Sequence, residues 1–334
     1  MRGVFIDANS SLAEIFERQR QPGDPEMRVH LNPDIKPEDW PAILDGAEIG
    51  VVDHTALPTD VARQCTGLKH VVFLGTGARS YMNPEELAEL GITVHLIKGY
   101  GDTAVAEAAI ALMWAAARGL AQMDREMRAG NWLRDDGMQL TGKTLGLIGF
   151  GGIAAEVARI ASGSGMKVIA WNRSPKSHPG VAFTDLDTLL KESHVVSLHL
   201  LLNDETRGFL SRQRIAQMRK GVIFVNTARA AIVDEAAMID ALRSGHIHHA
   251  GLDVFNTEPL PANHVLTTIP NVTLSAHVAS ASARFDEARK RRVGYELSLV
   301  LQGMWPVSCV NPSVLQDTAL RRWQPVSMDR GPNS

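Results

Sequence analysis

A glycine-rich segment in the middle of the chain separates an apolar run from a helical pattern, and this arrangement constrains the fold more than any other feature. Residues 144–148 are largely apolar, residues 149–154 read Gly-Phe-Gly-Gly-Ile-Ala, and a helical pattern follows as far as Ser162. A second apolar run at residues 167–171 completes a strand–helix–strand unit. Two strands joined through a helix pair in parallel, and the helix packs on one face of the sheet. The sequence therefore predicts an α/β protein with a parallel sheet.

The same alternation extends toward the N-terminus. Strands are predicted at residues 50–52, 70–74 and 92–95, and helices at residues 58–64 and 84–90. Each of these helices has a proline near its first turn, where proline is tolerated best. Alternation of this kind predicts a second parallel sheet.

Four more strands are predicted beyond the glycine-rich unit, at residues 194–200, 222–226, 250–254 and 272–275. They complete a doubly wound domain of residues 100–283. A last helix, near residues 284–302, leads back toward the N-terminal part. The simplest division is one domain inserted into another, which is made of residues 1–99 and 284–334.

Two segments do not follow the alternation. Residues 24–40 are proline-rich, and we expect them to form a surface excursion. Residues 102–119 form a helical pattern that is apolar on nearly every face, and such a helix is expected to be buried all round. The pattern leaves open whether it lies inside its domain or across a subunit interface.

Composition excludes several classes of protein. The chain has 334 residues and a net charge of −3, with no basic run long enough to follow a nucleic-acid backbone. Cys65 and Cys309 are the only cysteines, so neither a disulfide framework nor a cysteine-based metal site is expected. The longest apolar stretch, residues 104–117, contains Glu107 and is too short to cross a bilayer. We therefore expect a cytoplasmic protein that binds neither nucleic acid nor a membrane.

The glycine-rich segment has the form of a dinucleotide-binding loop. Gly149 permits a tight turn, Gly151 lets a pyrophosphate approach the backbone, and Ala154 allows close helix–strand packing. Gly152 and Ile153 open the helix, whose free N–H groups would bind the phosphates. The alternative interpretation is a glycine-rich turn without a ligand; the complete strand–helix–strand context argues against it.

The end of the next predicted strand indicates which dinucleotide is bound. An acidic residue often bonds the adenosine ribose at this position, but here the chain reads Asn172-Arg173-Ser174, with Lys176 close behind. Arg173 can pair with a 2′-phosphate, so the sequence favours NADP(H) over NAD(H). NAD(H) stays possible, because Arg173 could instead be a solvated loop residue while Asn172 bonds the ribose.

Three polar residues follow three consecutive predicted strands: Arg229, Glu258 and His277. Taken singly, they could be a surface cation, a turn residue and a hydrogen-bonded core histidine. Together they arrive at the carboxyl edge of one sheet, where ligands of open α/β sheets bind. A guanidinium, a carboxylate and an imidazole can hold an anionic substrate and transfer a proton. The other nearby histidines, His246, His248 and His249, are expected at the surface, and no spacing suggests a metal site.

The chain resembles the D-isomer-specific 2-hydroxyacid dehydrogenase family over nearly its whole length. The resemblance is carried by residues 147–153, 218–229, 250–255, 258–259 and 276–279. It implies that Arg229 binds substrate, that His277 is the acid/base and that Glu258 is its partner. It also implies that the nicotinamide lies against Thr227, Ala228 and Asp253. The substrate carboxylate would be held by backbone N–H groups of Gly75, Thr76 and Gly77.

The resemblance also implies the architecture and the reaction. It predicts two doubly wound parallel-sheet domains, a Rossmann cofactor domain and a flavodoxin-like substrate domain, with a cleft between them, in a homodimer. In the predicted reaction a small 2-keto acid is reduced to a D-2-hydroxy acid. Residues 172–174 look most like those of NADPH-preferring glyoxylate/hydroxypyruvate reductases.

The sequence departs from the family pattern at Ala276, where a proline is usual, and at residues 78–81. These departures put the pocket for the substrate side chain in doubt. Two alternatives stay open: a dehydrogenase for another small anion such as phosphite, and a nucleotide-sensing scaffold like the family's corepressor members.

Overall fold

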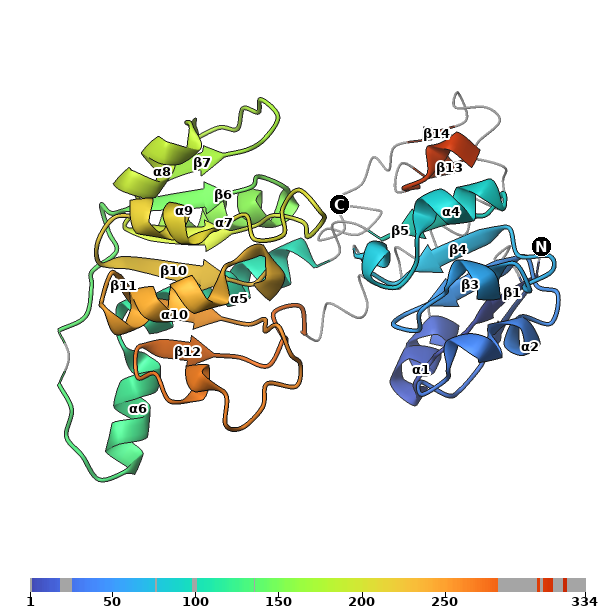
Figure 1. The fold of residues 1–334 in the computed structure, drawn as a ribbon, viewed down its shortest axis with the longest axis horizontal. Helices are drawn as coiled ribbons and strands as arrows, with labels where there is room; N and C mark the ends of the chain where they lie inside the picture. Colours follow the sequence, from blue (N-terminus) through green and yellow to red (C-terminus); the bar gives the residue numbers. More distant parts are fainter. Residues whose placement is uncertain are drawn as a thin grey trace. The chain divides into compact units, whose positions relative to one another are not determined.

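The computed structural model describes residues 2–18, 26–75, 77–97, 101–134, 136–281, 305–306, 309–314 and 321–322. The chain separates into two compact units (Figure 1). One unit consists of Met1–Gly101 together with Ser282–Ser334, and the other is Asp102–Ala281. The helix expected at residues 284–302 lies outside the described residues.

The first unit contains a five-stranded sheet in the order β2-β1-β3-β4-β5, and every neighbouring pair is parallel. This is the flavodoxin-like strand order, as predicted. The strands are β1 (Arg2–Phe5), β2 (Glu26–Val29), β3 (Ile49–Val52), β4 (His70–Phe73) and β5 (Thr93–Leu96). Buried side chains pack on both faces of this sheet. Its α-helices are α1 (Ser10–Arg18), α2 (Trp40–Leu44), α3 (Thr59–Ala62) and α4 (Pro84–Glu89).

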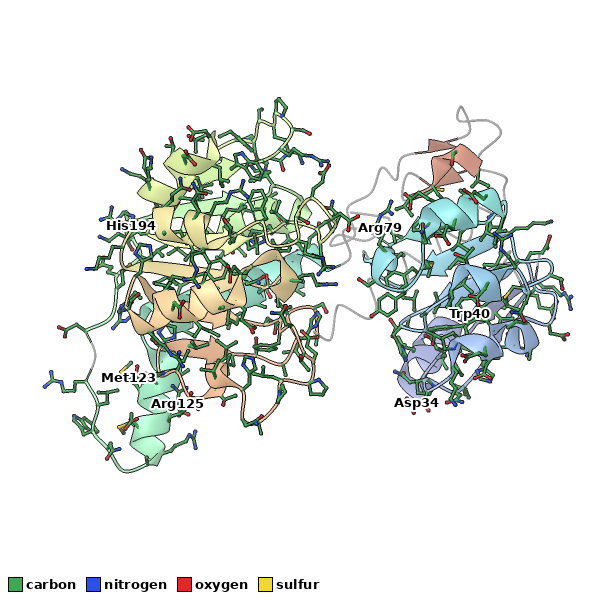
Figure 2. The ribbon with its side chains drawn as sticks, viewed as in Figure 1. Asp34, Trp40, Arg79, Met123, Arg125 and His194 are labelled. Carbon is green, nitrogen blue, oxygen red and sulfur yellow. The ribbon has the colours of Figure 1, made fainter. Side chains whose placement is uncertain are left out.

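The prediction that residues 24–40 form a surface excursion was wrong at both ends of the segment. Strand β2 lies within it, and Trp40 starts α2 with a fully buried side chain (Figure 2). The reason is that β2 is an edge strand of four residues in which Met27 and Val29 face the core and Glu26 and Arg28 are exposed. Short, charged edge strands limit aggregation, but two apolar residues are too few for their alternation to identify a strand.

A C-terminal segment attaches to the free edge of the first unit's sheet. The side chain of Asn311 is buried and accepts a hydrogen bond from the Val94 N–H at 2.8 Å. It also donates to the carbonyl oxygens of Pro84 and Ile92 at 2.9 and 2.8 Å. A buried amide with all these partners holds residues 309–314 against β5 and α4. Near the end of the described chain, β13 (Trp305–Pro306) pairs with β14 (Arg321–Arg322).

The second unit contains a seven-stranded parallel sheet in the order β12-β11-β10-β9-β6-β7-β8. The chain runs outward from β6 through β7 to β8, then returns to the other side of β6 at β9. The switch point of this Rossmann-type order therefore lies at β6 and β9. The strands are β6 (Thr144–Ile148), β7 (Lys167–Trp171), β8 (Ala182–Phe183), β9 (Val195–Leu198), β10 (Val222–Asn226), β11 (Ile247–Leu252) and β12 (Val272–Leu274).

Helices cover both faces of this sheet, and each face has its own cluster of buried side chains. One face carries α5 (Asp102–Ala117) and α7 (Gly152–Gly163). The other carries α8 (Leu186–Glu192), α9 (Arg212–Gln217) and α10 (Glu235–Arg243). The architecture is thus the predicted pair of doubly wound parallel-sheet units.

Helix α5 is not buried all round within its unit. Ala106, Ala109 and Met113 face the sheet and are buried, whereas Glu107 and Ala111 are exposed. A second helix, α6 (Leu120–Arg128), follows beside β12, where Arg125 donates to the Pro270 carbonyl oxygen at 3.0 Å (Figures 1 and 2). No single helix among the described residues is long and apolar enough to span a membrane. The pair α5 and α6 passes that test only when joined across a 63° bend.

Candidate active site

The glycine-rich loop between β6 and α7 has a backbone that side chains would obstruct. Gly149 has a φ of 87°, and a Cβ there would lie 2.7 Å from the carbonyl oxygen of His199. Only glycine fits this combination of left-handed backbone and close approach. At Gly151 a Cβ would meet nothing within 4 Å, so this part of the loop faces open space. At Gly152 a Cβ would overlap the carboxylate of Asp102, which is 1.8 Å from the position it would take.

The N-terminus of α7 has no side-chain cap from its own residues, and the carboxylate of Asp102 lies beside Gly152. The N-cap residue is Gly151, which supplies no side-chain hydrogen bond, and the first turn has no acidic residue. Free N–H groups at a helix start are a ready site for phosphate. Ala154 is fully buried and lets α7 pack closely, and Ile153 is partly buried at the loop. This loop fits a dinucleotide pyrophosphate.

Side chains of the loop after β7 form hydrogen bonds with the glycine-rich loop. From the sequence, this loop was expected only to bind the adenosine ribose and its 2′-phosphate. Asn172 accepts a hydrogen bond from the Phe150 N–H at 3.1 Å and donates to the Ser174 carbonyl oxygen at 2.8 Å. Lys176 donates to the Phe150 carbonyl oxygen at 2.6 Å. Arg173 is exposed and forms an ion pair with Glu205, a residue of the loop after β9. The pairing with Glu205 was not predicted, because 32 residues separate the two in sequence.

The turn after β10 sets the position of Arg229. The buried side chain of Asn226 accepts a hydrogen bond from the Ala228 N–H at 2.9 Å and donates to the Arg229 carbonyl oxygen at 3.2 Å. The Arg229 guanidinium is partly buried and donates to the Ala228 carbonyl oxygen at 2.7 Å. Next to it, Thr227 has a buried Oγ1 with no hydrogen-bond partner among the described residues. A buried hydroxyl without a partner is costly, and it fits a site that a polar ligand completes.

His277 and Glu258 are in direct contact. The Nδ1 atom of His277 lies 2.6 Å from Oε2 of Glu258, and both side chains are partly solvent-accessible. The other carboxylate oxygen of Glu258 accepts a hydrogen bond from the Phe255 N–H at 2.9 Å. This arrangement orients the imidazole through Nδ1 and leaves Nε2 as the atom that can exchange a proton with a ligand.

The carboxylate of Glu258 is held in its ionised form. Burial raises the pKa of the Glu258 carboxyl, but the hydrogen bond from His277 opposes this, as do the Phe255 N–H and the positive charges of His277 and Arg229. The net pKa of Glu258 lies below its ordinary value. The charge of Arg229 is the smallest of the causes that lower the pKa of Glu258, and Arg229, Glu258 and His277 follow the neighbouring strands β10, β11 and β12 of one sheet.

Asp253 holds the loop that carries His277. Its side chain is only 1% exposed. Oδ1 accepts hydrogen bonds from the Ser275 hydroxyl at 2.6 Å and the Val278 N–H at 3.0 Å, and Oδ2 accepts one from the Ala279 N–H at 2.9 Å. His277 lies between these anchors with a φ of 52°, a left-handed conformation that non-glycine residues rarely adopt. The sequence did not indicate this role: Asp253 was placed inside a predicted strand, and the family resemblance assigned it only to the nicotinamide half of the cofactor.

The residues predicted to bind the substrate carboxylate, 75–77, belong to the first unit. Gly75 and Gly77 follow β4, and Gly77 is the N-cap of a short 3₁₀ helix (Ala78–Ser80); Thr76 lies outside the described residues.

The prediction that His249 is a surface residue was wrong. It lies in β11, is buried, and contacts the Thr273 hydroxyl at 3.0 Å through Nε2. Among the described residues, no three His, Cys, Asp or Glu side chains are placed to hold a metal ion.

Known proteins with similar sequences show the family to which this chain belongs. Residues 110–279 match the family model described as D-isomer specific 2-hydroxyacid dehydrogenase, NAD binding domain. The chain belongs to this dehydrogenase family. A hydroxypyruvate reductase of Thermotoga maritima is 39% identical over 73% of this chain and 79% of its own length. A glyoxylate reductase of Thermofilum pendens is 33% identical over 85% of this chain and 89% of its own length.

Solved structures agree with the fold of this 2-hydroxyacid dehydrogenase. A glyoxylate reductase from Paecilomyes thermophila has a TM-score of 0.81 and 27% identity, covering 94% of this chain and 99% of that one. An acyclic imino acid reductase in complex with NADPH and D-Arg has a TM-score of 0.82 and 26% identity, covering 93% and 100%. The dehydrogenase is thus an oxidoreductase of a family that reduces 2-keto acids with NAD(P)H.

Proposed function

We propose that this dehydrogenase reduces glyoxylate or hydroxypyruvate to the corresponding 2-hydroxy acid, of D configuration where the product is chiral, with NADPH preferred over NADH. The observation that supports this most directly is the His277–Glu258 contact at 2.6 Å with the charge of Arg229 acting on it. All three residues follow neighbouring strands of one parallel sheet. The substrate class follows from relatives named hydroxypyruvate reductase and glyoxylate reductase.

In this proposal the second unit is the cofactor domain, residues 100–283, and residues 1–99 and 284–334 form the substrate domain. The pyrophosphate is bound by Gly149, Gly151, Gly152 and the start of α7 at Ile153. The adenosine ribose lies against residues 172–174. Thr227, Ala228 and Asp253 line the nicotinamide half, and the unpaired Thr227 hydroxyl is the group there that needs a ligand partner. When bound, the reduced cofactor supplies a hydride to the carbonyl carbon.

The chain's own residues supply orientation and the proton. The planar fork of Arg229 binds the carboxylate and carbonyl oxygens of the keto acid and polarises the C=O bond. Protonated His277 donates the Nε2 proton to the alkoxide oxygen that forms, and Glu258 stabilises the imidazolium through Nδ1. The family resemblance assigns the backbone N–H groups of residues 75–77 to binding of the substrate carboxylate. In the oxidation direction neutral His277 removes the hydroxyl proton.

The test is a steady-state panel of glyoxylate, hydroxypyruvate, pyruvate and phenylpyruvate, each with NADPH and with NADH. We expect the highest kcat/KM with glyoxylate or hydroxypyruvate and NADPH. Phosphite with NADP⁺ or NAD⁺ forms a further arm, and turnover of phosphite alone would overturn the substrate assignment. Binding of dinucleotide without turnover of any acid would instead favour the nucleotide-sensing scaffold.

Cofactor preference is assigned to Arg173. A charge-assisted hydrogen bond to the 2′-phosphate is worth about 1.5–3 kcal/mol, or roughly 10- to 150-fold in affinity. Arg173→Ala should weaken NADPH binding by about that factor and leave NADH binding nearly unchanged. Asn172→Asp combined with Arg173→Ala should shift the preference toward NADH, because the new carboxylate bonds the ribose and repels the phosphate. Equal loss for both cofactors would contradict this assignment.

We also propose that the protein is a homodimer. The outer face of α5 is partly exposed, and α6 with the segment after it carries exposed apolar side chains: Leu120, Met127, Trp132 and Leu133. Trp132 is 79% exposed, and tryptophan is one of the residues enriched at protein–protein interfaces. A second copy is the simplest occupant, because most soluble oligomers are two-fold homo-oligomers. Light scattering at micromolar concentration should give a dimer, and Trp132→Ser should shift it toward monomer; a monomeric wild type would overturn the proposal.

A further inference from the structure

The proposed function assigns the 2′-phosphate of NADP(H) to the guanidinium of Arg173. This guanidinium already has an anionic partner within the chain. Nη1 of Arg173 pairs with Oε2 of Glu205. The two side chains are 74% and 69% exposed, so both are within reach of a ligand from solvent. Asp204, which precedes Glu205, is also exposed but has no ion-pair partner among the described residues.

The sheet order places this ion pair across the cofactor region. Arg173 follows β7 and Glu205 lies in the loop after β9, while β6 lies between these two strands. The pair therefore joins loops on either side of β6, whose carboxyl end carries the glycine-rich loop. This is the switch point of the sheet, where the ligands of open α/β folds bind.

We propose that Glu205 is a specificity-determining residue that competes with the 2′-phosphate of NADP(H) for Arg173. The inference rests on the proposed function, because it concerns the same cofactor site. Glu205 engages Nη1 of the guanidinium, so a phosphate that binds the fork containing Nη1 has to displace the carboxylate. A carboxylate that stayed would be a like charge beside the phosphate.

The competition must be mild, because the pair is exposed. Exposed ion pairs typically change an equilibrium only about 1.4- to 5-fold, so incoming phosphate can displace the carboxylate. NAD(H) has no 2′-phosphate and leaves the pair intact. Glu205 thus lowers the preference for NADP(H) below the value that Arg173 alone would produce, and it keeps NAD(H) a usable second cofactor.

The experiment compares Glu205→Gln with wild type by equilibrium titration of the full-length protein with NADPH, NADH and 2′,5′-ADP. Asp204→Asn is the matched control, since it removes the same charge one residue away. Arg173→Ala and the Arg173→Ala/Glu205→Gln double variant complete a thermodynamic cycle. Melting temperatures of all variants check that each one folds.

We expect Glu205→Gln to tighten NADPH and 2′,5′-ADP binding by about two- to fivefold and to leave NADH within about 1.5-fold. The control variant should change neither cofactor by more than about 1.5-fold, and Glu205→Gln should give no gain once Arg173 is absent. An unchanged or weaker affinity for NADPH in Glu205→Gln would overturn the inference. An equal gain for NADH, an equal gain in Asp204→Asn, or a gain that persists without Arg173 would do the same.

These outcomes separate the inference from the cofactor assignment beneath it. If Arg173→Ala weakens NADPH binding while Glu205→Gln has no effect, only the role of Glu205 is refuted. If Arg173→Ala leaves NADPH binding unchanged, the assignment of Arg173 fails and the role of Glu205 fails with it.

Discussion

Replacing Asp253 by asparagine should slow catalysis without removing any group that touches the substrate. The buried carboxylate accepts three hydrogen bonds, from the Ser275 hydroxyl and from the N–H groups of Val278 and Ala279. In Asp253→Asn one oxygen becomes an NH₂ group, which must face a donor. At least one charge-assisted bond is then lost and one N–H group is left buried without a partner.

The magnitude follows from these bonds and from the backbone of His277. A hydrogen bond to a charged group contributes about 1.5–3 kcal/mol, which corresponds to roughly 10- to 150-fold in the population of a conformation. The left-handed backbone of His277, with φ 52°, costs about 1–2 kcal/mol that the bonds to Asp253 offset. When those bonds weaken, the loop can relax and move the imidazole away from Glu258. We therefore expect kcat to fall by roughly 10- to 150-fold.

The assay measures kcat and KM for the best keto acid, the dissociation constant of NADPH, and the melting temperature of the folded variant. The drop should appear mainly in kcat, with NADPH affinity changed by less than about threefold. Ser275→Ala, which removes one donor and leaves the carboxylate and both backbone bonds, is the matched variant and should lose less activity. Unchanged kcat in a folded Asp253→Asn protein would refute the positioning role. A loss confined to NADPH affinity would instead make Asp253 a cofactor ligand only.

The remaining predictions concern the triad. His277→Ala should lower kcat by ~10²–10⁴-fold with NADPH binding nearly intact, because only the general acid is lost; wild-type rates would remove His277 from the mechanism. Glu258→Gln removes the charge that stabilises the imidazolium, so the decline of the reduction rate with rising pH should begin at lower pH. An unchanged pH–rate profile would leave Glu258 as a turn residue. Arg229→Lys should lower kcat/KM by roughly 10- to 100-fold through both a higher KM and a lower kcat, because a point charge cannot replace a planar fork; near-normal kinetics would exclude Arg229 from the site.

Local patterns in the sequence were sufficient for the architecture. Alternating apolar runs and helical patterns predicted both parallel sheets, because a parallel pair requires a crossover helix. The left-handed turn at Gly149 was also predictable, since the glycine-rich segment stands between a strand and a helix. The prediction that Arg229, Glu258 and His277 share one edge came from a rule of parallel sheets, that the carboxyl ends of neighbouring strands lie together; the structure shows the His277–Glu258 contact.

Where a local pattern was weak or absent, prediction failed. Strand β2 was missed because a four-residue edge strand directs only Met27 and Val29 toward the core, which is too few residues to establish a period. His249 was placed at the surface because its own position carries no sign of the Thr273 hydroxyl that it meets on the next strand. The apolar pattern of α5 predicted burial on all faces, but Glu107 and Ala111 are exposed within its unit, and the sequence did not indicate which face the sheet covers.

The sequence by itself determined the class of fold, the position of the dinucleotide loop and the set of residues at the sheet edge. Only the tertiary structure decided how those residues are held: Asp253 anchoring the His277 loop, Asn172 joining two loops, and Glu205 occupying Arg173. The physical reason is distance along the chain. Helical and strand periods repeat over a few residues, whereas these hydrogen bonds join residues 22 to 32 positions apart. Their partners become neighbours only when separate strands are laid side by side in one sheet.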